Sequence, residues 1–188
     1  MTLITYLVLL GAYYGLRTGL LESGLSYVVA LKRLSNASWG EAVAFGVGFG
    51  SIEAIALGLP NMISIPLLYL NPSLIEQLPS SVQLQLSLPT VVIFAPIMER
   101  FFTLMIHILG SLLVIYAVIR RRKSYLVASI LYKGLVDGII PVIGQNVDLT
   151  TVQGIYLAET PFVGIGVLTI LCIYLMRRRY STSKDGKA

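Results

Sequence analysis

The stretch FFTLMIHILGSLLVIYAVI, residues 101–119, decides the fold class because it contains no Asp, Glu, Lys or Arg. An α-helix crosses the hydrocarbon core of a bilayer with about 20 predominantly apolar residues. Similar apolar runs recur along the chain, which is 56% hydrophobic and 12% charged and has a mean hydropathy of +0.82. Soluble domains carry about 25% charged residues. The composition therefore predicts a membrane protein.

Five segments are long and apolar enough to be transmembrane helices. None alternates polar and apolar residues over about ten positions, as the strands of a membrane barrel do. We therefore predict an all-α fold, a polytopic membrane helix bundle of about five transmembrane helices. The bundle is expected to occupy residues 1–179, with an outer proline-rich loop at 60–89 and a polar tail at 180–188. The predicted spans are 3–31, 40–59, 90–119, 124–144 and 153–176.

The lysine and arginine residues predict the orientation of these spans. They cluster after the first, third and fifth segments, whereas the loops 60–89 and 145–152 contain none. Because basic loops stay on the inner side, we expect the N-terminus outside and the C-terminus inside, in a multi-pass protein of the cell membrane. These basic flanks account for most of the net charge of +5 and lie near anionic headgroups. The lipid bilayer is thus the expected partner, and no nucleic-acid partner is expected.

Several ionisable side chains remain inside the predicted spans. Each costs about 2.5 to 3.5 kcal/mol at the bilayer centre, so such groups normally face the bundle interior and mark functional positions. At about 1.5 Å per residue, counting from the basic side brings groups from four helices into a shared band of depth. An alternative is that they only form internal salt bridges. The main groups are Arg17, Glu22, Glu53, Glu99, Arg100, His107, Lys133 and Asp137.

A stripe of small residues accompanies one of these acids. Ala42, Gly46, Gly50 and Ala54 recur at four-residue steps, which places them on one helix face. Small residues let a neighbouring membrane helix approach closely. Glu53 is therefore expected beside a tight helix contact.

Four stretches resemble, in order, conserved blocks of the YhfC-type intramembrane peptidases. These relatives of the CAAX-processing and bacteriocin-processing membrane proteases match over about residues 15–145. The resemblance implies that a glutamate pair activates water and that histidines polarise the scissile carbonyl. It makes Glu22, Glu53, Glu99, Arg100, His107 and Asp137 the candidate catalytic residues. The stretches are LLESGLSY at 20–27, FGVGFGSIEA at 45–54, ERFFTLMIHILGSLLV at 99–114 and LYKGLVDGIIP at 131–141.

The sequence departs from this pattern at four positions. Leu21 replaces one glutamate of the pair, and Ser26 stands where arginine is expected. Phe49 and Lys133 occupy positions where the family pattern has histidine. A zinc site commonly has about three protein ligands, mostly His or Cys, so a single central histidine predicts no metal ligands. The sequence does not decide whether a cofactor fills the central cavity.

Three functions are compatible with these observations. The first is a catalytically degenerate family member that acts as a membrane binding module or as a subunit of a membrane complex. The second is an active glutamic-type intramembrane protease that cleaves membrane-anchored peptides, with Glu22 or Glu53 as base and His107 as oxyanion donor. The third is a small proton-coupled carrier, because buried acids, lysine and histidine can relay protons.

Overall fold

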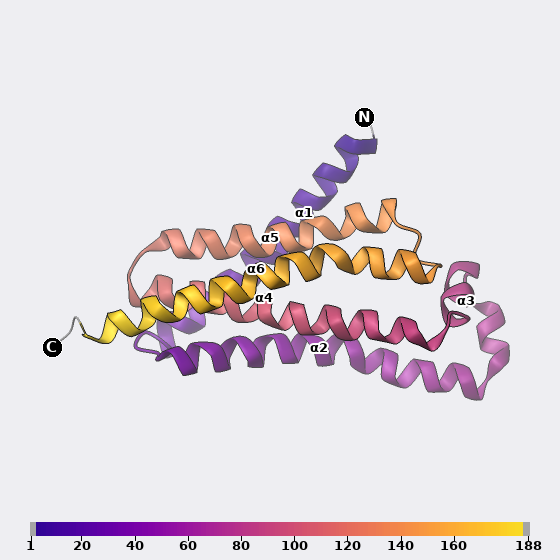
Figure 1. Ribbon diagram of the computed structural model, residues 1–188, viewed down its shortest axis with the longest axis horizontal. Coiled ribbons are helices and arrows are strands. Elements are labelled where there is room, and N and C mark those ends of the chain that lie inside the picture. Colours follow the sequence, from indigo (N-terminus) through magenta and orange to yellow (C-terminus); the bar gives the residue numbers. More distant parts are fainter. Residues whose placement is uncertain (1–2, 186–188) are drawn as a thin grey trace.

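The computed structural model describes residues 3–185 and is all-helical over that range (Figure 1). Two 3-10 helices, η1 and η2, and the short helix α3 connect the second and third long helices. The elements in chain order are α1 (Leu3–Arg33), α2 (Trp39–Leu70), η1 (Pro72–Gln77), α3 (Ser80–Leu86), η2 (Thr90–Ile93), α4 (Phe94–Ile119), α5 (Lys123–Asn146) and α6 (Val152–Asp185).

Four of the predicted spans are confirmed as helices that are long and apolar enough to cross a membrane: Trp39–Leu70, Thr90–Ile119, Lys123–Asn146 and Val152–Tyr180. The predicted first span is also a helix, α1, with 31 residues, but it is not among these four. Polar and charged side chains such as Arg17 and Glu22 lower its hydropathy. That α1 crosses the membrane therefore stays a prediction.

Helix α4 forms the centre of the bundle and contacts α1, α2, α5 and α6. Its middle supplies the most deeply buried apolar side chains, including Leu112, Val114 and Ile115. Figure 1 shows α2, α4, α5 and α6 running along the long axis of the molecule, while α1 crosses behind them and its N-terminal part extends beyond the bundle. The polar residues of α4 are consequently placed where several helices meet.

Helices α1 and α5 pack backbone to backbone through glycines. A Cβ atom added at Gly11 would lie 2.5 Å from the carbonyl oxygen of Gly138, and one at Gly15 would overlap the Gly134 carbonyl. Such a contact is possible only where side chains are absent. It brings the side chains that flank these glycines, among them Glu22 and Lys133, toward one another.

The predicted stripe on α2 faces α4. Ala42, Gly46 and Gly50 are buried. A Cβ atom added at Gly46 would lie 2.6 Å from the Cα atom of Ile108, and one at Gly50 would lie 3.1 Å from the Cβ atom of His107. The expected close helix contact is therefore present, and it sets Glu53 near His107.

The start of α2 is fixed by a capping box. The side chain of Ser38 accepts a hydrogen bond from the backbone N–H of Glu41 at 3.3 Å, and the Glu41 carboxylate accepts one from the Ser38 N–H at 2.7 Å. Such reciprocal bonds satisfy backbone donors that a helix start leaves free.

Helix α2 also shows that the predicted outer loop begins later than residue 60. Pro60 and Pro66 lie inside α2, which continues to Leu70. Proline removes one backbone hydrogen bond, but membrane helices tolerate it because neighbouring groups satisfy the freed carbonyl. The part of the predicted loop that is not α2 spans residues 71–89, and it contains η1 and α3.

The polar tail predicted for 180–188 is helical over much of its length. Helix α6 continues to Asp185, and residues 186–188 lie outside the described residues. The positively charged run Arg177 to Arg179 therefore lies within α6, directly after the predicted span 153–176.

Candidate functional site

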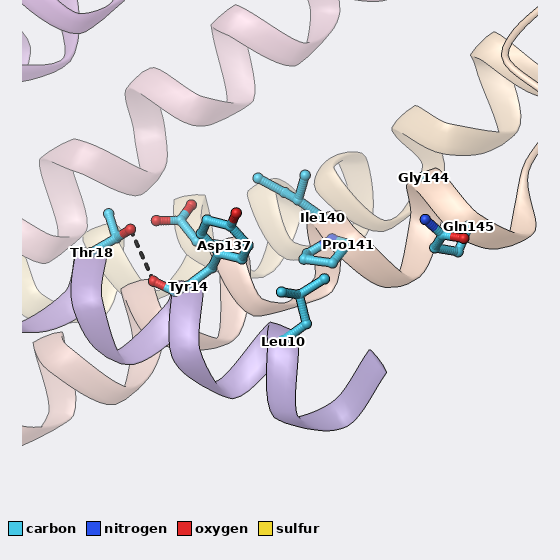
Figure 2. A pocket seen from close by; sticks show the side chains of 8 residues that line it. All are labelled: Leu10, Tyr14, Thr18, Asp137, Ile140, Pro141, Gly144 and Gln145. Carbon is cyan, nitrogen blue, oxygen red and sulfur yellow. Dashed lines mark hydrogen bonds between the residues drawn. The ribbon is translucent and has the colours of Figure 1, made fainter. Parts of the chain in front are cut away.

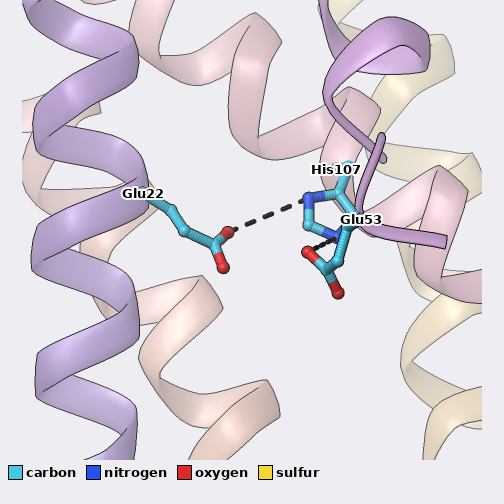
Figure 3. A group of neighbouring side chains, drawn as sticks. All are labelled: Glu22, Glu53 and His107. Carbon is cyan, nitrogen blue, oxygen red and sulfur yellow. Dashed lines mark ion pairs between the residues drawn. The ribbon is translucent and has the colours of Figure 1, made fainter. Parts of the chain in front are cut away.

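Four long helices each contribute one ionisable side chain to a cluster at the middle of the bundle: Glu22 from α1, Glu53 from α2, His107 from α4 and Lys133 from α5. Figure 3 shows the His107 ring between the two carboxylates. Lys133 and His107 are only 4% and 5% exposed, whereas the two glutamates are half-buried. Charged side chains that the sequence places at a similar depth in the membrane are therefore close together in the structure.

Lys133 is the most tightly held member of the cluster. Its Nζ atom lies 2.5 Å from Glu22 Oε2 and 3.4 Å from His107 Nδ1. The same ammonium lies 4.6 Å from the centroid of the Phe49 ring, which is a cation–π distance. A Cβ atom at Gly110 would lie 2.6 Å from Lys133 Cε, so the absence of a side chain there makes room for the lysine.

The imidazole of His107 links the lysine to the second glutamate. Its Nε2 atom lies 3.0 Å from Glu53 Oε2, and its Nδ1 atom lies 3.9 Å from Glu22 Oε2. In the tautomer with hydrogen on Nε2, that N–H donates to Glu53 while Nδ1 accepts from the Lys133 ammonium. The chain Glu22, Lys133, His107 and Glu53 then has a donor facing an acceptor at each step.

Two serines that the sequence analysis did not single out support this cluster. Ser23 Oγ and Ser129 Oγ are hydrogen-bonded at 2.9 Å, and Ser129 Oγ donates to the Gly110 carbonyl at 3.1 Å. Both serines are completely buried, and their bonds tie α1, α5 and α4 together. The sequence spacing could have identified Ser129, because it precedes Lys133 by four residues and therefore lies on the same helix face.

A small cavity of about 30 Å³ adjoins the cluster. One water molecule needs roughly 10 to 15 Å³ of such space together with polar partners, so the cavity is large enough for a water. The lining residues are Glu22, Glu53, Thr103, Ile106, His107, Lys133, Val136 and Asp137.

The other charged residues singled out from the sequence lie elsewhere. Glu99 and Arg100 form an ion pair with each other and do not line the cavity. Arg17 is exposed on α1. The structure thus brings together Glu22, Glu53, His107 and Asp137 of the six candidate catalytic residues.

The residues at two of the departures from the family pattern lie in this cluster. Phe49 packs against His107 with ring centroids 5.4 Å apart, and Lys133 lies between His107 and Glu22. In a comparison with known protein families, the family model described as YhfC intramembrane metalloprotease matches residues 1–157. The chain belongs to this family. No curated protein and no solved structure matches it.

The description of the YhfC family implies a metal ion, and three side chains have suitable donor atoms. Ligand atoms of Glu22, Glu53 and His107 all lie within 4.8 Å of one another, an arrangement that the sequence analysis did not predict. Lys133 changes what this set can bind. Its ammonium already contacts Glu22 and faces His107 Nδ1, where a metal ion would need ligand distances of about 2.0 to 2.2 Å.

Geometry and charge therefore argue against a metal at this position. The two carboxylates lie closest to different nitrogens of His107, so the three side chains would have to rearrange before one ion could bind all of them; catalytic zinc commonly has three protein ligands. The lysine ammonium also repels a cation. The residues present do not fit the metal that the family description implies.

Proposed function

We propose that this YhfC-family protein is a catalytically degenerate member that acts in the cell membrane as a binding module or as a subunit of a membrane complex. One observation carries the proposal: the Lys133 ammonium lies 2.5 Å from Glu22 and 3.4 Å from His107, inside the group of metal-ligand side chains. A side-chain cation supplies the charge that a metal would otherwise supply.

The surrounding substitutions support the same function. With Leu21 in place of a second glutamate, Glu22 has no adjacent carboxylate, and its oxygen is engaged by Lys133. Phe49 contributes an aromatic face where the family pattern has a possible ligand. The bundle is thus kept while one of the two glutamates that activate water in the family pattern is replaced.

Metal content and proteolysis test this function together. The full chain, purified in mild detergent with zinc supplied, is compared with Lys133→His, which adds the imidazole of the family pattern, and with Lys133→Met, which removes the charge without adding a ligand. We expect less than stoichiometric zinc in the native chain and in Lys133→Met, and increased zinc in Lys133→His. Mass spectrometry of single-span peptides in proteoliposomes should show no cleavage by the native chain.

Purification of the native chain as a lone monomer that cleaves these peptides would overturn the proposal. Stoichiometric zinc in the native chain, lost in Glu22→Gln and His107→Ala, would also overturn it. Co-purification of a membrane protein from the native host would support the subunit role only if the stoichiometry is fixed.

A second function is favoured by one specific observation. Glu53 Oε2 lies 3.0 Å from His107 Nε2, beside a cavity large enough for a water. A carboxylate and an imidazole at hydrogen-bond distance can act in general acid–base catalysis, as a metal-free glutamic-type protease requires. If Glu22→Gln, Glu53→Gln and His107→Ala each left peptide turnover unchanged, this alternative would be rejected.

A further inference from the structure

A larger pocket of about 440 Å³ lies between α1 and α5 (Figure 2), and His107 is not among its lining residues. Its volume is within the range of about 300 to 1,000 Å³ that is usual for small-molecule sites. Tyr14 and Ile140 on its rim are 39% and 51% exposed, so the pocket opens to the surroundings of the bundle. It is lined by Leu10, Tyr14, Thr18, Asp137, Ile140, Pro141, Gly144 and Gln145.

The pocket lies alongside the tight contact between α1 and α5 and extends past its end. The glycine contact reaches Gly11 on α1 and Gly138 on α5. Beyond it, α5 contains Pro141 and then Gly144, where an added Cβ atom would meet nothing within 4 Å. The missing side chain of Gly144 therefore leaves part of the pocket open.

Asp137 distinguishes this pocket from an ordinary lipid-filled groove. It lines both the 440 Å³ pocket and the 30 Å³ cavity at the His107 cluster. Within residues 3–185 it has no ion-pair partner, because the nearby Lys133 ammonium is bound to Glu22. Figure 2 shows its carboxylate beside Thr18 at one end of the pocket.

The charges around Asp137 favour a cationic ligand. Glu22, Glu53 and Asp137 line the small cavity together with a single ammonium, that of Lys133, which leaves an excess of two negative formal charges when His107 is neutral. Excess charge inside a bundle is costly unless a counter-charge is present. Most of the remaining lining of the large pocket is apolar and includes Leu10, Ile140 and Pro141, although Thr18 and Gln145 add polar groups.

We infer that this pocket binds a lipophilic amine, with the hydrocarbon part against α1 and α5 and the protonated amine at Asp137. A primary amine is cationic at neutral pH. The inference gives the proposed binding role a ligand class and rests on that role. The experiments distinguish the proposed function from the amine site. Proteolysis by the native chain would contradict the proposed function but would not change where an amine binds.

Photolabelling of the full chain in nanodiscs of neutral phosphatidylcholine tests the inference. The probe is dodecylamine with a diazirine in its alkyl chain, and the comparison probe is the corresponding dodecanol. We expect the amine to label the α1 and α5 segments that line the pocket, and unmodified dodecylamine to compete. The labelling should fall at least about tenfold in Asp137→Asn, since a charge-assisted hydrogen bond is lost.

Matched variants separate filling of the pocket from damage to the fold. Gly144→Leu should fill the pocket and abolish labelling, whereas Gly58→Leu, at another helical glycine with open space, should not. Asp148→Asn, in the loop before α6, should label like the native chain. Equal labelling by amine and alcohol in the native chain would mean occupation by lipid only and would overturn the inference. Labelling that persists in a folded Gly144→Leu variant, or no labelling of the native chain, would also overturn it.

Discussion

At the scale of single residues, Lys133 is the positive charge of the cluster. Its ammonium is almost completely buried and has three partners: Glu22, His107 and the face of Phe49. A buried ion pair contributes little compared with an apolar pair, but removal of one partner leaves the other charge uncompensated. Substitutions of Lys133 and Glu22 should therefore have strongly non-additive effects on the free energy of unfolding.

Lys133→Met tests this coupling. We expect the free energy of unfolding of this variant to be about 3 kcal/mol lower than that of the native chain, because the Glu22 carboxylate loses its cation. The double variant with Glu22→Gln should recover most of this loss. The measurement is denaturant unfolding in detergent micelles, arranged as a double-mutant cycle. Additive effects of the two substitutions would contradict the pairing.

Asp148, in the loop between α5 and α6, gives a pH prediction. A hydrogen bond from the Thr150 hydroxyl at 2.6 Å, and a second from its backbone N–H at 2.9 Å, lower the pKa of Asp148 below its ordinary 3.8. The stabilisation is thus present above pH 3.8 and is lost as the pH falls through the lower folded-state pKa.

Thr150→Ala removes the hydroxyl donor, so the pKa of Asp148 should rise toward its ordinary value. Carbon NMR titration of labelled aspartate carboxyls measures this. Thr160→Ala, whose hydroxyl donates to the Tyr156 carbonyl in α6, is the control and should leave the Asp148 titration unchanged. An equal titration in all three proteins would show that the hydroxyl has no role.

The sequence predicted which charged residues share a depth, but not how they pair. Counting along each helix places Glu22, His107 and Lys133 near the midplane, and the structure brings these three together. Lys133 and Asp137 are four residues apart and share one face of α5, yet the ion-pair partner of Lys133 is Glu22 on another helix. Pairing depends on how each helix is rotated about its axis, which is set by contacts between helices that one sequence does not specify.

At the scale of elements, the glycines of α1 determine how it packs. Gly11, Gly15 and Gly19 all lie against the α5 backbone, whereas Gly24 faces open space. Substitution by alanine raises the helix propensity equally at all four positions, by up to about 1 kcal/mol. A difference between them therefore reports the helix contact alone.

Gly15→Ala should destabilise the bundle by about 1 to 3 kcal/mol, the usual cost of overpacking, because the new methyl group overlaps the Gly134 carbonyl. Gly24→Ala should be neutral or slightly stabilising. Thermal unfolding in detergent, monitored by circular dichroism, compares the two. Equal melting temperatures would contradict the close contact between α1 and α5.

The end of α2 shows where prediction of elements from sequence was weaker. Proline was expected to end the helix at residue 60, but α2 includes Pro60 and Pro66. Proline is a strong helix breaker in water, where the freed carbonyl and loop conformations are well solvated. In an apolar environment a non-helical backbone is more costly, so the helix continues. The long apolar runs were predicted correctly because their length alone requires helices.

At the scale of the whole molecule, the connections between helices lie at two ends. The loop 34–38 and the turn between α4 and α5 are at the same end of the bundle as the C-terminal part of α6, and α3 lies at the other (Figure 1). The first end carries the basic residues, and this distribution predicts that it faces inward.

Cysteine labelling checks this orientation. The experiment uses a Cys172→Ala background. Two exposed serines are replaced, by Ser81→Cys in α3 and Ser124→Cys at the start of α5. A membrane-impermeant maleimide added to intact cells should label position 81, and position 124 only after permeabilisation. The reverse pattern would mean an inverted topology.

The central lysine also determines what the bundle requires for assembly. A bound ion is taken from the surroundings, and its occupancy varies with supply and with chelators. The Lys133 ammonium is covalently part of α5, so the positive charge opposite Glu22 is present in every copy as soon as the helix has been synthesised. Under the proposed function, formation of this cluster would need no metallation step, and metal starvation of the cell would leave the pair of Lys133 and Glu22 unchanged.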